Sequence, residues 1–414
     1  MRRWPRDPAK QGVARPEDPK RPSPGGHQTH PGPEPKRAPH VPEHHLTQGL
    51  YERHARHMPV VGGAGPVDLG QGGTPLRPSR AIGPAAGIPD LRFKMEHLNP
   101  TGSYKDRFAG LAVGEARAAG HEACLATSSG NTGAALAAFC AAAGMGCALY
   151  VSENAPQGKL EQMLAYGAEV WRVERFTIDA AESAEISRTL ATEAAARGMQ
   201  LYITAYAVSP GPMEGIKTIA YELHADAPGL SDVFTPVGGG GLHLAIARGF
   251  ADLREDGARS TTPRLHVVQP AGNDTVSTPL REGAAEARPV DTATSISGLG
   301  VGYILDGTEA LHSARASGGT GYVIDEDEIR AVQRRLAREE GILVEPAGAV
   351  SVAGALQAAA RGELAGDGPV VCILTGHGFK DPATLKAMGA EPGARRISRA
   401  GIAATFPPMP ETVP

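Results

Sequence analysis

Aromatic residues are scarce in this chain, and neither sign of charge is in large excess. Only 5% of the 414 residues are Phe, Trp or Tyr, and 41 basic against 45 acidic side chains give a formal net charge of −4. Proteins that bind nucleic acids combine basic surfaces with aromatic side chains on which bases stack. We therefore expect no nucleic-acid partner and no electrostatic attachment to an anionic membrane.

Cysteine is rare too, with only Cys124, Cys140, Cys147 and Cys372 and no C-x-x-C pair among them. Three of the four lie in apolar, Ala-rich surroundings, where a thiol behaves as a small hydrophobic side chain. This pattern predicts buried free thiols in a reducing compartment rather than disulfides or zinc ligands. We expect no metal site.

Long apolar runs are absent as well. No stretch approaches the roughly 20 residues that span a bilayer. The N-terminus also lacks the apolar segment and cleavage site of a secretory signal. The expected location is the cytoplasm, without membrane attachment.

Both ends of the chain differ in composition from its middle. Residues 1–45 are rich in Pro, Arg, Lys, His and Gly and contain too few apolar residues to form a core. They are expected to form a disordered tail, and a misplaced start codon would explain them equally well. Residues 393–414 are expected to form a C-terminal tail.

Between the tails, strand-like runs alternate with glycine-containing turns and Ala-rich helices. This order is typical of right-handed β-α-β units on a parallel sheet. Several runs are apolar without alternation, as in strands that are buried on both faces. The sequence therefore predicts an α/β fold with doubly wound parallel sheets. The predicted strands are 91–95, 123–127, 147–151, 168–173, 200–204, 232–237, 265–269 and 370–375, and the predicted helices are 134–143, 158–166, 177–197 and 242–249.

One lysine, Lys105, lies in the small-residue segment Asn99-Pro-Thr-Gly-Ser-Tyr-Lys-Asp-Arg107, just after a predicted strand. Its strongly hydrated ammonium group stabilises neither a turn nor a buried helix start. Buried lysines lower their pKa readily, and they act as bases and Schiff-base nucleophiles. We predict that Lys105 is catalytic. The alternative is a solvated lysine at a helix N-terminus.

Ligands of open parallel sheets bind beyond the carboxyl ends of the strands. Ser128-Ser-Gly-Asn-Thr-Gly133 follows one predicted strand and precedes a helix, whose free N–H groups can receive a carboxylate or phosphate. A plain helix N-cap explains this segment equally well.

Four consecutive glycines, Gly238–Gly241, follow the predicted strand 232–237. Their backbone entropy costs about 1 kcal/mol each relative to alanine, and a phosphate held by backbone N–H groups would offset that cost. The segment has neither the Lys-Ser/Thr of a P-loop nor the spacing of a dinucleotide fingerprint. A flexible linker is the alternative.

The predicted strand 370–375 is followed by Gly-His-Gly-Phe-Lys-Asp-Pro382. The Thr375 hydroxyl at the end of the strand can hydrogen-bond a ring nitrogen. His377, between two glycines, fits a plain loop residue better than a catalytic one.

Together these segments resemble the motifs of the pyridoxal-phosphate enzymes of the tryptophan-synthase-β fold type, which include threonine synthase and threonine dehydratase. The motifs occur in family order within residues 68–390. The resemblance implies two doubly wound parallel-sheet domains, with pyridoxal 5′-phosphate in the cleft between them. It implies a larger cofactor-binding domain over residues 46–105 and 205–392, and a smaller mobile α/β domain over residues 106–204. Smaller matches are Gly70–Leu76, Lys159–Val170 and Glu345–Gly348.

The resemblance also implies a role for each motif. Lys105 would carry the cofactor as a Schiff base and later move the α-proton of the substrate. Asn131 would hydrogen-bond the 3-hydroxyl of the ring, and Thr375 would meet its nitrogen. Residues assigned to the cofactor phosphate are Gly238, Gly239, Gly240 and Gly241. Residues assigned to the substrate carboxylate are Ser128, Ser129, Asn131 and Thr132.

The closing motif and Glu214-Gly-x-Lys-Thr218 are similar to threonine synthase, which converts O-phosphohomoserine and water to threonine and phosphate. Three segments depart from it. The glycine run is more like the dehydratases, and Ile296–Gly302 resembles the cysteine-synthase branch. Pro212 stands where an arginine aimed at the substrate phosphate is often found.

A threonine-synthase-like lyase acting on the side chain of an amino acid is therefore the leading hypothesis. The alternatives are a serine/threonine dehydratase, a β-replacing synthase of the cysteine-synthase type, and a ligand sensor that keeps the cofactor without its chemistry. The resemblance also implies a homodimer, although no feature of the sequence shows one.

Overall fold

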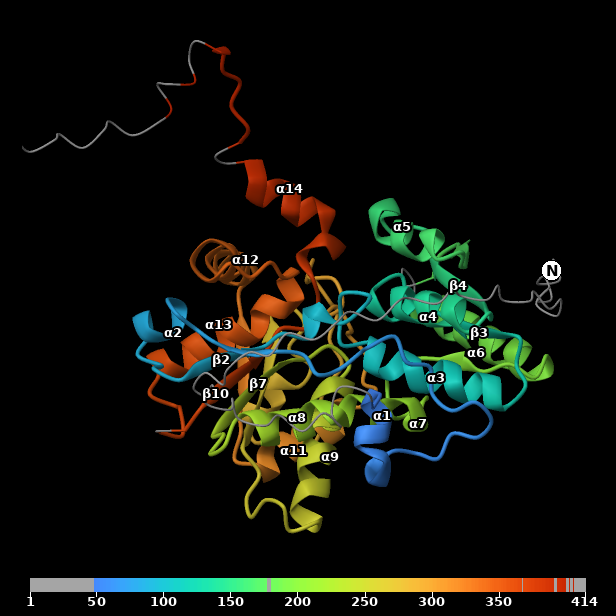
Figure 1. Cartoon of the computed structure of the whole chain (residues 1–414), viewed down its shortest axis with the longest axis horizontal. Coiled ribbons are helices and arrows are strands. Elements are labelled where there is room, and N and C mark those ends of the chain that lie inside the picture. The colour runs from blue at the N-terminus through green and yellow to red at the C-terminus, as the bar shows by residue number, and fades with distance from the viewer. Residues whose placement is uncertain are drawn as a thin grey trace, which may run out of the picture.

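A computed structural model describes residues 48–176, 180–366, 368–390 and 393–399, together with residues 402 and 405. The predicted tail over residues 1–45 lies outside the described residues, and the predicted tail over residues 393–414 lies only partly within them. The described chain forms two β-sheets covered by helices (Figure 1).

The larger sheet has six strands in the order β1-β2-β10-β7-β8-β9. All neighbours pair in parallel except β1, which runs antiparallel to β2 at the edge of the sheet. Pro78 ends β1, and an edge tolerates a residue that cannot donate a ladder hydrogen bond. The strands are β1 (Leu76–Pro78), β2 (Leu91–Lys94), β7 (Asp232–Pro236), β8 (Arg264–Pro270), β9 (Gly321–Ile324) and β10 (Val370–Ile373).

The smaller sheet has four parallel strands in the order β5-β4-β3-β6. Its strands and its helices α4 (Asn131–Ala142) and α6 (Ala180–Ala196) lie to the right of the larger sheet in Figure 1. The strands are β3 (Ala123–Ala126), β4 (Gly146–Ser152), β5 (Glu169–Val173) and β6 (Leu201–Tyr202).

Burial explains why the inner strands have no alternating pattern. Every residue of β3, β7 and β10 is buried, because helices cover both faces of these strands. Helices α4 and α13 (Pro346–Ala360) are Ala-rich and apolar on nearly all sides, as expected for helices enclosed by other elements. The two parallel sheets with their helices confirm the predicted α/β class.

The remaining helices surround the sheets. They are α1 (Leu50–Arg53), α2 (Ile82–Ala85), α3 (Asp106–Ala118), α5 (Gln157–Ala165), α7 (Pro210–Met213), α8 (Thr218–Asp226), α9 (Gly241–Glu255), α10 (Ser277–Arg281), α11 (Gly307–Ala316), α12 (Glu326–Arg335) and α14 (Pro382–Ala390), with short turns η2 (Ala55–His57), η3 (Glu96–Leu98), η4 (Glu214–Lys217), η5 (Leu336–Glu340) and η6 (Gly378–Lys380).

Several element boundaries differ from the prediction. Helix α4 begins at Asn131 instead of residue 134, so its first turn contains residues that were predicted to form a loop. The strand predicted over 200–204 is only two residues long, because Ile203 and Thr204 leave the sheet to line a cavity. Strands β1 and β9, which form the two edges of the larger sheet, were not predicted.

The described cysteines are all buried and free, which confirms their predicted character as small apolar side chains. Within the described ranges, no helix is both long and apolar enough to cross a membrane.

Candidate active site

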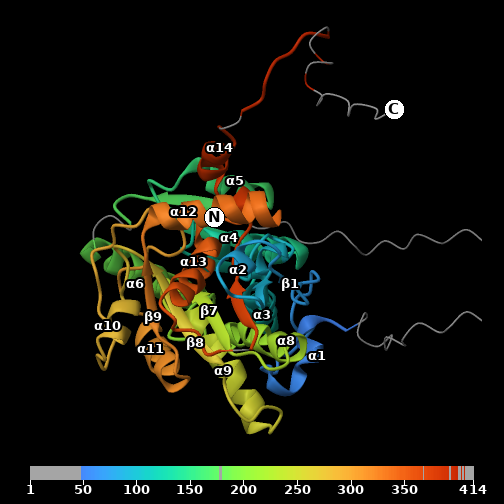
Figure 2. The ribbon, with the colours of Figure 1, turned by 90° about the vertical axis from the view of Figure 1, so that its left-hand side faces the viewer.

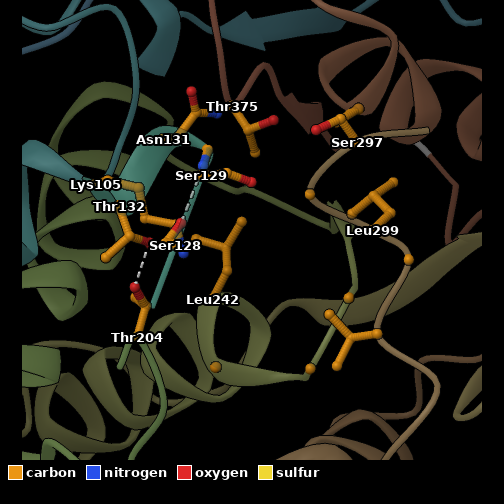
Figure 3. A pocket seen from close by; sticks show the side chains of 18 of the residues that line it. Lys105, Ser128, Ser129, Asn131, Thr132, Thr204, Leu242, Ser297, Leu299 and Thr375 are labelled. Atoms are coloured by element: carbon orange, nitrogen blue, oxygen red, sulfur yellow. Dashed lines mark hydrogen bonds between the residues drawn. The ribbon is translucent and has the colours of Figure 1, made fainter. Parts of the chain in front are cut away.

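The carboxyl ends of β2, β3, β7 and β10 meet at a cavity of about 410 Å³ between the two sheets. Every site residue predicted from the sequence lines this cavity, although the segments lie far apart along the chain (Figure 3). These residues are Lys105, Ser128, Ser129, Asn131, Thr132, Gly238, Gly239, Gly240, Gly241 and Thr375.

Lys105 immediately precedes α3 and lines the cavity from the side of β2. Its Nζ lies 4.6 Å from the centre of the Tyr104 ring, and none of the described residues accepts a hydrogen bond from it. Burial lowers its pKa to about 7, because the charged form loses its hydration. A large part of this amine is therefore neutral, and hence nucleophilic, near neutral pH.

A buried carboxyl group, Glu345, stands beside Lys105. Burial raises the pKa of Glu345 to about 7. The nearby Lys380 ammonium acts in the other direction, because a positive charge stabilises the carboxylate. Oε1 of Glu345 accepts a hydrogen bond of 2.8 Å from Nδ2 of Asn131. Asn131 is thereby held at the start of α4 with its amide toward the cavity.

The segment before α4 presents a helix N-terminus to the cavity. The Ser128 hydroxyl accepts a hydrogen bond from the Gly130 N–H at 3.2 Å, and the Thr132 and Thr204 hydroxyls are 2.7 Å apart (Figure 3). The first N–H groups of a helix have no partner within it, and the helix dipole favours an anion there. This end of the cavity is suited to a carboxylate.

At Gly238 and Gly240, the backbone that surrounds the turn formed by the glycine run leaves no room for a larger side chain. Gly240 has φ +101°, and a Cβ there would lie 2.7 Å from the backbone of Asp306. A Cβ on Gly238 would lie 2.8 Å from the Gly298 carbonyl oxygen. The run leads directly into α9, so its N–H groups and the helix N-terminus form a cradle for an anion.

Asp306 holds this turn in place. Its backbone N–H donates to the Gly239 carbonyl at 3.0 Å. Its carboxylate accepts from the backbone N–H groups of Tyr206 at 2.8 Å and Ala207 at 3.1 Å. The glycine turn and the segment after β6 are therefore joined through one buried residue.

Thr375 follows β10 and lines the cavity beside Asn131, the first residue of α4 (Figure 3). Thr375 is 4% exposed, and its carbonyl oxygen accepts from the Tyr104 N–H at 3.1 Å. This bond places the end of β10 next to Lys105. His377 does not line the cavity; its Nδ1 accepts from the Phe379 N–H at 3.2 Å and caps η6.

Three groups of cavity residues had no assigned role in the sequence-based prediction. Glu345 and Lys159 belong to segments noted only as smaller family matches, and Lys380 was part of the closing motif. Ser297–Val301 lies within the segment that resembles the cysteine-synthase branch, and it covers the glycine turn. Pro212 is buried in α7 and does not line the cavity. In the described part of the chain, no cluster of three or more His, Cys, Asp or Glu side chains could hold a metal ion.

A family model described as "Pyridoxal-phosphate dependent enzyme" matches residues 67–376. The chain belongs to this family. Its cofactor is pyridoxal 5′-phosphate, and the residues that line the cavity fit that group. A lysine amine with a depressed pKa faces the space, and a glycine turn that excludes side chains offers backbone N–H groups to a phosphate.

Relatives of this pyridoxal-phosphate-dependent enzyme include threonine synthases. The enzyme of Methanosarcina acetivorans is 34% identical over 344 residues, covering 82% of each chain. That of Mycobacterium tuberculosis is 35% identical over 349 residues, covering 83% of this chain and 92% of the relative. Among solved structures, maize serine racemase matches with a TM-score of 0.64 and 23% identity, over 77% of this chain and 92% of the other. The last match shows the fold alone.

Gly240→Ala is expected to weaken cofactor binding by roughly tenfold or more. Its Cβ would meet the Asp306 backbone, and a non-glycine residue at positive φ costs on the order of 1–2 kcal/mol. The measurement is titration of the cofactor-free protein with pyridoxal phosphate. Gly239→Ala is the matched control, since its Cβ would meet only side chains at 3.4 Å or more, and it should lose less. Equal losses for the two variants would refute the steric explanation.

Proposed function

We propose that this enzyme is a lyase acting on the side chain of an amino acid, and that its reaction is that of threonine synthase, O-phosphohomoserine and water to threonine and phosphate. The observation that carries the proposal is the cavity itself, which combines the Lys105 amine, an anion cradle and the neutral Thr375 hydroxyl in a chain related to threonine synthases.

The residues divide the work of holding the cofactor. Lys105 Nζ would bond to its carbonyl carbon, and Gly238–Gly241 would hold its phosphate through backbone N–H groups. Asn131 Nδ2, already oriented by Glu345, would donate to the 3-hydroxyl of the ring. Thr375 would meet the ring nitrogen.

Pyridoxal phosphate, when bound, supplies an electron sink for the charge left on the substrate's α-carbon. A hydroxyl such as Thr375 does not hold a proton on the ring nitrogen as an aspartate would. This weakens charge withdrawal and favours elimination or replacement at the side chain over transamination.

The chain's own groups would orient the substrate and move its protons. Ser128, Ser129, Asn131 and Thr132, at the start of α4, would bind its carboxylate through the helix N-terminus. The neutral Lys105 Nζ would take the α-proton, since a base whose pKa lies near the working pH is the most efficient one.

The domain boundaries also belong to the proposal. Residues 106–204 would form the smaller mobile domain, and residues 46–105 with 205–392 the larger cofactor-binding domain. Each contributes one side of the cavity, so a movement between them would open and close the site.

A dehydratase or a β-replacing synthase is the second candidate. Pro212 places no cation in the cavity. Ser297–Val301, within the segment that resembles the cysteine-synthase branch, lies against the glycine turn. Either enzyme would use the same cofactor groups on a different side chain.

The deciding experiment measures released phosphate, ammonia and keto acid from O-phosphohomoserine, threonine, serine and O-phosphoserine. Phosphate release from O-phosphohomoserine, together with formation of threonine, would establish the proposed reaction. Ammonia and keto acid from serine or threonine, without that phosphate release, would establish a dehydratase. Release of nothing by the cofactor-loaded protein would indicate a ligand sensor.

A further inference from the structure

The cavity is lined by more basic than acidic side chains. Among the described lining residues, the ionisable Lys and Glu side chains are Lys105, Lys159, Lys380 and Glu345. The proposed function uses Lys105 for the cofactor, the glycine turn for the cofactor phosphate and the start of α4 for the substrate carboxylate. This assignment gives Lys159 and Lys380 no role in binding the cofactor or the substrate.

Lys380 has hydrogen-bonding capacity to spare. Its Nζ donates to Oε1 of Gln162 at 2.8 Å, and this is its one hydrogen bond within the described chain, although an ammonium group has three donors. Burial lowers its pKa, opposed by the carboxyl groups of Glu345 and Asp106. Burial raises the pKa of Glu345 to about 7 and that of Asp106 to about 6. Near neutral pH, these two carboxyl groups therefore neutralise the Lys380 ammonium only in part.

Lys159 lies in the first turn of α5, and its ammonium group has no ion-pair or hydrogen-bond partner in the part of the chain that the structure describes. Its ammonium acts on the same Glu345 carboxyl group as that of Lys380. Two cations from neighbouring elements therefore line the same cavity and act on the same carboxyl group. A charge placed in a partly buried site without a partner is costly, which indicates that an anion completes the site.

The two lysines come from elements that close over the cavity. Helix α5 follows β4 of the smaller sheet, whereas η6 and α14 follow β10 of the larger one. Helices α5 and α14 lie side by side in Figures 1 and 2. Gln162 links them, since its Nε2 donates to the Thr101 carbonyl at 3.0 Å while its Oε1 accepts from Lys380. The glycine turn lines the same cavity, but neither lysine is among the groups that lie against it, so this pair is distinct from the phosphate cradle.

We propose that the ammonium groups of Lys159 and Lys380 bind a phosphate-like dianion on the side chain of the substrate. This assignment rests on the proposed function and deepens it. Two cations match a phosphate ester in charge, and they replace the cation that is absent at Pro212. The leaving phosphate would be held between α5 and η6, so its binding would also favour the closed arrangement of these two elements.

The test compares Lys159→Gln, Lys380→Gln and the double variant, each loaded with cofactor, with Lys386→Gln as the control. Lys386 is exposed on α14 and does not line the cavity. Glutamine removes the charge and keeps a donor, and Lys380→Arg, which keeps the charge, should retain most of the function. The visible absorbance of the bound cofactor verifies that each variant is loaded.

For the phosphorylated substrate, kcat/KM should fall roughly tenfold to a hundredfold for each lysine removed, as expected for a charge-assisted hydrogen bond. For threonine or serine, any measurable turnover should fall less than it does for the phosphorylated substrate. The inhibition constant of inorganic phosphate should rise in parallel. Equal losses on phosphorylated and neutral substrates, or no loss at all, would overturn the assignment.

Binding of inorganic phosphate to the holoenzyme, measured by calorimetry, separates this inference from the proposed function. If the wild-type enzyme releases no phosphate from any substrate, the threonine synthase assignment fails. Phosphate binding that is lost in the double variant would still support the anion site. Absence of phosphate binding to the wild type, or tighter lysine-dependent binding of succinate than of phosphate, would overturn it.

Discussion

Lys105→Ala should lose the visible absorbance of the bound cofactor and lower turnover by at least roughly a thousandfold. Proton transfer by a positioned base contributes on the order of 10²–10⁴-fold by itself, and the variant also loses the amine that would bond to the cofactor. Because burial lowers the pKa of Lys105 to about 7, much of its amine is neutral near neutral pH and can act as a nucleophile and a base. Absorbance spectra and the product assay described above measure both losses.

Lys386→Ala is the control for that experiment, because its side chain is exposed on α14. Borohydride reduction of the wild-type holoenzyme, followed by peptide mapping, should locate the cofactor on Lys105. A cofactor found on another lysine, or an unchanged spectrum in Lys105→Ala, would refute the assignment.

Arg107→Met is expected to lower the free energy of unfolding by about 3–5 kcal/mol, which is typical of breaking a buried ion pair. The guanidinium is 0% exposed and bonds Glu96 and Glu222 at 2.7–2.8 Å. Burial alone would lower the pKa of Arg107, but the Glu222 and Glu96 carboxylates outweigh it and raise that pKa. Methionine would leave the Glu96 carboxylate, itself 0% exposed, without its counter-charge.

Urea unfolding followed by circular dichroism measures this loss. Arg188→Met is the matched control, since Arg188 pairs with Glu185 on the exposed face of α6 and should contribute less than about 1 kcal/mol. Adding Glu96→Gln to Arg107→Met should recover part of the stability, because it removes the unpaired buried charge. An Arg107→Met protein as stable as the Arg188→Met protein would contradict this account.

Much of the site could be predicted because its parts are local in sequence. Each binding loop directly follows a predicted strand, and parallel strands direct their carboxyl ends to the same edge of a sheet. Lys105, the start of α4, the glycine run and Thr375 consequently meet in one cavity, as the order of motifs indicated. Their chemical roles stay predictions.

Other features required contacts between distant residues. The hydrogen bond from Asn131 to Glu345 joins positions 214 residues apart, and no local pattern specifies it. The antiparallel strand β1 and the edge strand β9 depend on the neighbours that they pair with, and neither was predicted from the sequence.

By itself, the sequence determined the α/β class and the family, and it named the residues proposed to hold the cofactor, because these depend on residue type and on order along the chain. Only the tertiary structure decided the environment of those groups. Burial gives Lys105 its reactive amine, and the approach of α5 to η6 brings Lys159 and Lys380 to one cavity. Desolvation and charge pairing depend on distance in space, which the folded chain alone defines.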